Sequence, residues 1–83
     1  MAQNTNSELV KLIRNEIDLG FTFMETHRLS SSREHSVQAE ENAKTALETA
    51  KRFLNDLSEE QANAFRPDLE RLEGLIDSAA ALG

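Results

Sequence analysis

Apolar side chains recur every three or four residues along three long stretches of the chain, which is the spacing of amphipathic helices. These stretches predict helices over residues 6–29, 32–57 and 59–81. No segment alternates apolar and polar residues over the length that a strand needs. Because short connections make consecutive helices antiparallel neighbours, we expect an all-α, up-down-up three-helix bundle that forms a single domain over residues 1–83. We expect residues 1–5, before the first helix, to be flexible.

The apolar faces of the first two helices differ in shape. The apolar arc of the first helix covers half of its circumference, which suits contact with two other helices. Gly20 lies within this arc, where it lets another backbone approach at a cost of about 1 kcal/mol of helix propensity. The second has small residues toward its N-terminal half and large ones toward its C-terminal half, which predicts tight packing at one end. The first arc comprises Leu9, Val10, Leu12, Ile13, Ile17, Phe21, Phe23 and Met24, and the second comprises Ala39, Ala43, Ala46, Ala50, Phe53, Leu54 and Leu57.

Capping boxes mark the predicted starts of all three helices. In a capping box a hydroxyl accepts a free backbone N–H of the first turn, and a longer polar side chain reaches back to the cap residue. The three boxes are Thr5 with Glu8, Ser31 with Glu34, and Ser58 with Gln61.

Pro67 lies inside the third apolar pattern and would normally break a helix. The pattern nevertheless continues in phase from Ala62 to Ala79, and Pro67 falls on the solvent side. We therefore predict one helix with a kink at Pro67. The alternative is two segments, with Pro67 as the first residue of the second.

Composition limits the classes of partner. The chain has 83 residues, no cysteine and a net charge of −6, with basic residues scattered rather than clustered. Such a charge repels nucleic acid and anionic membranes, so we expect neither as a partner. No signal peptide or apolar membrane span is present, and we assign the chain to the cytoplasm by default.

Two short motifs carry a resemblance to known helical hairpins. Leu19-Gly20-x-x-Phe23 resembles the first-helix motif of tetratricopeptide-type units, and Ala43-x-x-x-Leu47-x-x-Ala50 is similar to their second-helix motif. The overall plan looks closer to the three-helix bundle of microtubule-interacting-and-trafficking domains. Both families bind peptides or helices in grooves between their helices, so the resemblance implies a protein-binding function.

Both histidines flank the predicted corner between the first and second helices. His27 and His35 could meet there, and a metal site would need further ligands, for which Glu34 and Asp77 are the local candidates. The structural interpretation is favoured, because His27 near a helix C-terminus interacts with the helix dipole, and no metal-binding motif is present. We expect no cofactor.

Serine chemistry at the same corner is not favoured. Ser30, Ser31 and Ser32 lie near the histidines in sequence, but Ser31 is assigned to a cap and no oxyanion donor is evident. A chain this short also has little stability with which to hold strained catalytic geometry. We expect a protein that is not an enzyme.

A second line of apolar residues extends beyond the main stripes. Leu12, Leu19 and Phe23 form one edge of the first helix, and Val37 and Leu75 fall outside the stripes of theirs. These residues either pack against the third helix or lie singly on the surface, or they form a patch that binds a partner helix or a second copy of the chain. The leading hypothesis is an interaction module that uses Leu12, Leu19 and Phe23, and the alternative is a metal- or ligand-binding bundle that uses His27 and His35.

Overall fold

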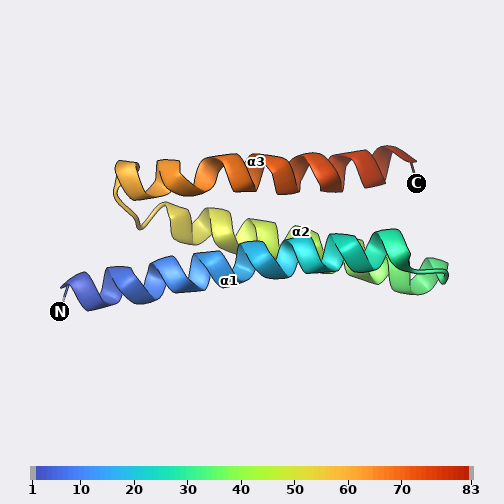
Figure 1. The fold of residues 1–83 in the computed structure, drawn as a ribbon, viewed down its shortest axis with the longest axis horizontal. Helices are drawn as coiled ribbons and strands as arrows, with labels where there is room; N and C mark the ends of the chain where they lie inside the picture. Colours follow the sequence, from blue (N-terminus) through green and yellow to red (C-terminus); the bar gives the residue numbers. More distant parts are fainter. Residues whose placement is uncertain (1, 83) are drawn as a thin grey trace.

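The chain folds into three helices, as a computed structural model shows (Figure 1). The structure describes residues 2–82, and the side chains of residues 7–81. Helix α1 spans Ala2–Leu29, α2 spans Arg33–Leu54 and α3 spans Glu59–Leu82. They run up, down and up in an elongated body of 46 × 18 × 15 Å, with no strand among the residues described. The all-α three-helix prediction is confirmed.

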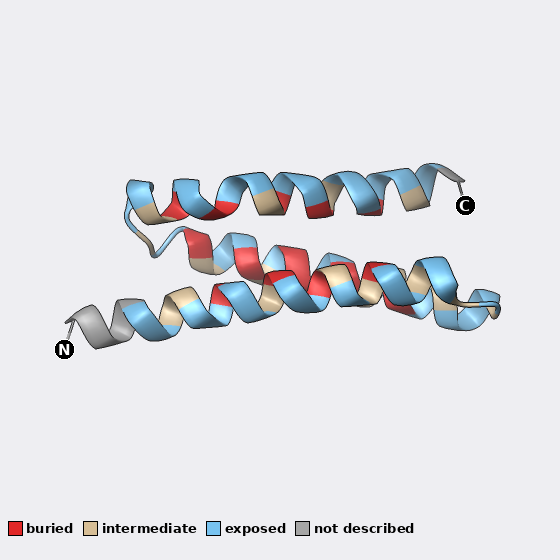
Figure 2. Cartoon of the chain, in the orientation of Figure 1, coloured by how far each residue is buried: buried red, intermediate tan, exposed pale blue. Residues whose placement is uncertain are grey.

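The core runs along the middle of the bundle, where the buried faces of the three helices meet (Figure 2). Ile13, Ile17 and Leu72 are the largest side chains that are fully buried. Burying a side chain of this size contributes about 1.5–3 kcal/mol. The buried hydrophobic residues are Ile13, Ile17, Met24, Ala39, Ala43, Ala46, Leu47, Ala50, Leu54, Ala62, Phe65, Leu69, Leu72 and Ile76.

Small residues set the close packing of the first two helices. Ala39, Ala43, Ala46 and Ala50 are all buried, and they recur every three or four residues along α2. A helix surface without long side chains lets a neighbouring helix approach closely. This explains why α1 packs most extensively against α2.

Helix α3 meets the hairpin of α1 and α2 through the glycine that the sequence placed in the apolar arc. Gly20 of α1 is buried, and a Cβ atom built there would overlap the Cδ2 atom of Leu72. The missing side chain of Gly20 is therefore what lets the fully buried Leu72 reach α1.

The predicted capping boxes have different outcomes. Ser58 and Gln61 form theirs, because the Gln61 N–H donates to Ser58 Oγ at 3.2 Å and the Ser58 N–H donates to Gln61 Oε1 at 3.4 Å. The box at Ser31 and Glu34 is wrong by one residue. Ser32 has the extended backbone of a cap (φ −96°, ψ 126°), and its Oγ accepts the His35 N–H at 3.4 Å.

Two further boundaries differ from the prediction. Helix α1 begins at Ala2, so Thr5 lies within the helix rather than at its cap, and the side chain of Thr5 is outside the described part. Helix α2 ends at Leu54 rather than at residue 57, because the N–H groups of residues 55–57 bond three residues back, as in a tightened final turn. The expected flexibility of residues 1–5 stays a prediction.

Pro67 is accommodated inside α3. The helix is continuous from Glu59 to Leu82, so the alternative of two segments is wrong. Both Pro67 and Asn63, whose carbonyl loses its partner at the proline, lie in exposed positions where water can bond that carbonyl. The kink at Pro67 stays a prediction. Along residues 2–82, none of the helices combines the length and the apolar character needed to cross a bilayer.

Candidate interaction surface between α1 and α2

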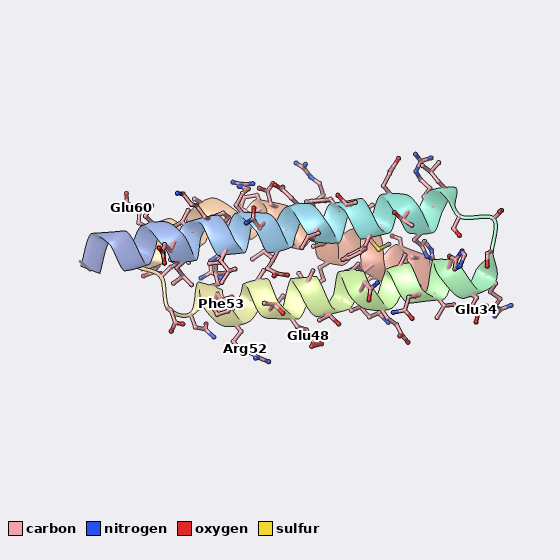
Figure 3. All side chains as sticks on the ribbon, turned by 90° about the horizontal axis from the view of Figure 1, so that it is seen from below. Glu34, Glu48, Arg52, Phe53 and Glu60 are labelled. Carbon is pink, nitrogen blue, oxygen red and sulfur yellow. The ribbon has the colours of Figure 1, made fainter. Side chains whose placement is uncertain are left out.

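Helix α3 covers one side of the hairpin and leaves the other uncovered. Arg14 of α1 pairs with Asp68 of α3 at 3.3 Å, and Lys51 of α2 pairs with Glu73 of α3 at 3.0 Å. Figure 3 views the bundle from the opposite side, with α1 and α2 in front and α3 behind them. We call this side the open face.

The α1 half of the open face carries the apolar edge that the sequence indicates. Leu12 is 39% exposed and Leu19 is 45% exposed, so α3 does not bury them. Phe23 follows Leu19 by one helical turn, but it is only half exposed and packs against the core. Leu12 and Leu19 are therefore available for a further contact, whereas Phe23 also belongs to the fold.

The α2 half of the open face is flatter. Ala39 and Ala46 are buried, yet they lie outside the central core cluster. The hydroxyl of Thr45 donates to the Glu41 carbonyl at 3.1 Å, and that of Thr49 donates to the Thr45 carbonyl at 2.9 Å. Because these hydroxyls bond their own helix, their hydrogen-bonding capacity is partly used, and the surface of α2 here is less polar than its sequence suggests.

Phe53 closes one end of the open face, and sequence reasoning missed this role. It is half buried and points from α2 toward α1, whereas Glu48 and Arg52 point away (Figure 3). The sequence placed Phe53 in the apolar stripe of α2. Its position at the edge of that stripe could have indicated this role, since an edge residue can contact both the core and a surface groove.

A hollow of about 640 Å³ lies on this face between the N-terminal half of α1 and the C-terminal end of α2. Its apolar lining comes from Leu9, Leu12 and Phe53. Its polar lining comes from Glu8, Lys11, Asn15 and Asp56. An apolar centre with a charged border is the arrangement of a protein-binding surface.

The histidines lie at the opposite end of the hairpin, where His27 contacts Ser36, the neighbour of His35. The Nδ1 atom of His27 lies 2.9 Å from the Ser36 carbonyl and 2.8 Å from Ser36 Oγ. His35 and Asp77 are exposed. Among the residues that the structure describes, no group of three or more His, Asp or Glu side chains is placed to hold a metal ion.

The pairing of His27 with Ser36 lies at the corner between α1 and α2. Nδ1 either donates its proton to the Ser36 carbonyl or accepts the Ser36 hydroxyl, according to the tautomer of the ring. The Ser36 hydroxyl also faces the His27 carbonyl at 3.5 Å. His27 therefore joins the end of α1 to the start of α2.

One exposed ion pair occupies the end of α1. The carboxylate of Glu25 accepts hydrogen bonds from Arg28, and this contact, with the attraction of the two charges, lowers the pKa of Glu25. The same contact raises the pKa of Arg28. Both side chains are more than half exposed, so the pair is a surface feature.

The other exposed apolar residues lie around α3 rather than on the open face. Leu75 is 44% exposed and borders a hollow of about 430 Å³ shared with Met24 and His27. Val37 is 49% exposed and borders another hollow, on the side of α2 that faces Ala79 and Ala80. Leu29, at the end of α1, is 67% exposed, more than any other large apolar side chain that the structure describes, and the sequence had not singled it out.

Comparison with models of known families, with curated proteins and with solved structures gives no match to this chain. The resemblance to tetratricopeptide-type and microtubule-interacting-and-trafficking-type bundles therefore stays a prediction.

Proposed function

We propose that this protein is a non-catalytic interaction module that binds a helix on its open face. The observation that carries the proposal is the exposure of Leu12, which lines the hollow between α1 and α2, and of Leu19, two helical turns further along the same side of α1. Exposed apolar residues that form one contiguous patch often mark a site of protein–protein interaction.

The shape of the open face favours a helix as the guest. Large residues project from α1, small residues line α2, and Phe53 stands at one end. A third helix laid along such a groove would bury its own apolar stripe against Leu12 and Leu19, with anchors spaced at three, four and seven residues. The helix belongs either to another protein or to a second copy of this chain.

The fold allows a clean test with a matched control. Leu12→Glu with Leu19→Glu places charges on the open face, and Leu75→Glu places one at a leucine of nearly equal exposure beside α3. We expect all variants to keep the helical circular-dichroism spectrum of the wild type, since the replaced side chains are exposed.

Partner capture then uses a photo-crosslinking amino acid at Asn15, on the open face, and at Arg71, an exposed position on α3. We expect a partner protein to crosslink to position 15. This partner can then be identified, purified and shown to bind through a helix. That binding should be lost in the Leu12, Leu19 variant and kept in Leu75→Glu.

Self-association is measured in parallel by light scattering coupled to size exclusion, at about 10 and about 200 μM. A dimer that Leu12→Glu and Leu19→Glu dissociate would support the proposal with a second copy as the guest. If neither a dimer nor a partner depends on Leu12 and Leu19, the proposed function is wrong.

A further inference from the structure

Charged side chains around the open face are predominantly acidic. Glu8 and Asp56 border its hollow together with Lys11, and Glu16 lies one helical turn from Leu12. The face therefore carries three acidic residues, Glu8, Glu16 and Asp56, against one basic residue, Lys11.

The cations that could neutralise these acids are used elsewhere. Arg14 pairs with Asp68 and also lies over the Phe65 ring at 5.2 Å, and Lys51 pairs with Glu73, so both point to α3. Lys44 pairs with Glu40 at 3.2 Å, and Glu40 borders a hollow shared with α3. None of these three acids takes part in an ion pair among the described side chains.

We propose that the open face docks a cationic amphipathic helix of another protein, with an apolar stripe on Leu12 and Leu19 and lysine or arginine residues on its flanks. This inference rests on the proposed function and specifies the chemistry of its partner. Long basic side chains at the flanks of the guest would reach the acids that border the groove, and complementary charge of this kind sets orientation and raises the rate of association.

The same charges argue against a second copy of the chain as the guest. Each copy has a net charge of −6, and two open faces brought together would set acid against acid. Like charges opposed across an interface disfavour that pairing. An anionic membrane surface is disfavoured on the same ground.

The test uses three synthetic helices of about 18 residues with one leucine stripe in common. Their flanks carry lysine, glutamine or glutamate. Binding to the full chain is measured by calorimetry at low and at physiological salt. We expect the lysine peptide to bind at least about tenfold more tightly than the glutamate peptide, with the glutamine peptide between them, and the difference to shrink as salt screens the charges.

Two triple variants, each of which removes three negative charges, show where the attraction of the lysine peptide arises. Glu8→Gln, Glu16→Gln and Asp56→Asn remove acids from the open face, and Glu60→Gln, Glu70→Gln and Asp77→Asn remove three exposed acids from α3. We expect the first set of substitutions to weaken binding of the lysine peptide several-fold more than the second set does. Circular dichroism confirms that both remain folded. Equal weakening by the two sets would overturn the inference, because the attraction would then come from net charge alone.

The remaining outcomes separate this inference from the proposed function. If all three peptides bind equally and Leu19→Glu abolishes their binding, the open face is a docking site without charge selection, and only the inference is overturned. If no peptide binds but a dimer forms that Leu19→Glu dissociates, the guest is a second copy, which again overturns the inference alone. If no peptide binds and the chain is a monomer, the inference is overturned, and the proposed function is overturned with it when no captured partner depends on Leu12 and Leu19.

Discussion

Gly20 of α1 lies directly against Leu72 of α3, in a contact that leaves no room for a side chain on the glycine. Leu72 is fully buried, so its methyl groups cannot turn aside into solvent. This contact places α3 on one side of the hairpin and thereby determines which side stays open.

Gly20→Ala should destabilise the bundle, and Gly74→Ala should stabilise it. A Cβ atom at position 20 would overlap Leu72, whereas one at position 74 would meet nothing within 4 Å. Overpacking costs about 1–3 kcal/mol, which exceeds the gain in helix propensity at position 20. At position 74 only the gain of about 0.5–1 kcal/mol remains. Urea unfolding of the two variants measures both effects, and a stabilised Gly20→Ala would show that α3 does not pack there.

The helix cap provides a second pair of variants. Ser32→Ala removes the hydroxyl that accepts the His35 N–H at 3.4 Å, and should cost about 0.5–1 kcal/mol, toward the lower end for caps because the bond is long. Ser31→Ala should change the free energy of unfolding by less than about 0.5 kcal/mol, because Ser31 is exposed and does not cap α2. Thermal unfolding distinguishes them, and the reverse order would restore the cap to Ser31.

Residues of the apolar edge should differ in their importance for stability. Leu19→Glu should change the free energy of unfolding by less than about 0.5 kcal/mol, since Leu19 is exposed. Phe23→Glu should cost at least about 2 kcal/mol, since Phe23 packs against the core. Chemical denaturation tests both. A large loss in Leu19→Glu would mean that Leu19 is part of the fold and that the open face is not free.

The Glu25–Arg28 pair predicts a small dependence on pH. The pKa of Glu25 is lower in the folded state than in the unfolded state, mainly through its hydrogen bond to Arg28. Its contribution to stability is therefore present above the ordinary carboxyl pKa and is lost as the pH falls through the folded value. The melting temperature of the wild type should be slightly higher than that of Glu25→Gln at pH 7, and the two should be equal in acid.

Glu70→Gln serves as the control for this pH series, because Glu70 is exposed and has no ion-pair partner among the described side chains. A Glu25 effect that grows toward acid pH would have the wrong sign for an ion pair and would contradict the assignment.

Much of the fold can be read from the sequence because helix periodicity records burial directly. Ile13, Ile17, Met24, Ala39, Ala43, Ala46, Ala50 and Leu54 all belong to predicted apolar stripes and are buried, and the pattern through Pro67 correctly indicates one helix. The cap was misplaced by one residue because Ser30, Ser31 and Ser32 are chemically equivalent candidates. Only the backbone conformation selects among them.

The open face could be predicted only in part. A helical wheel orders Leu12, Leu19 and Phe23 around the axis of α1, but it does not say on which side of the hairpin α3 packs. That choice depends on the three-dimensional fit of Gly20 to Leu72, and it decides that Leu12 and Leu19 are exposed while Phe23 is half buried.

Binding of a helix to the open face is tested by titrating the isotope-labelled protein with the lysine-flanked peptide and following its amide resonances. We expect the shifts to concentrate at Leu12, Leu19 and Phe53 and to spare Leu75 and Val37. Shifts concentrated instead around Leu75 and Ala79 would contradict this binding, and so would an unchanged spectrum from a chain that light scattering shows to be a monomer.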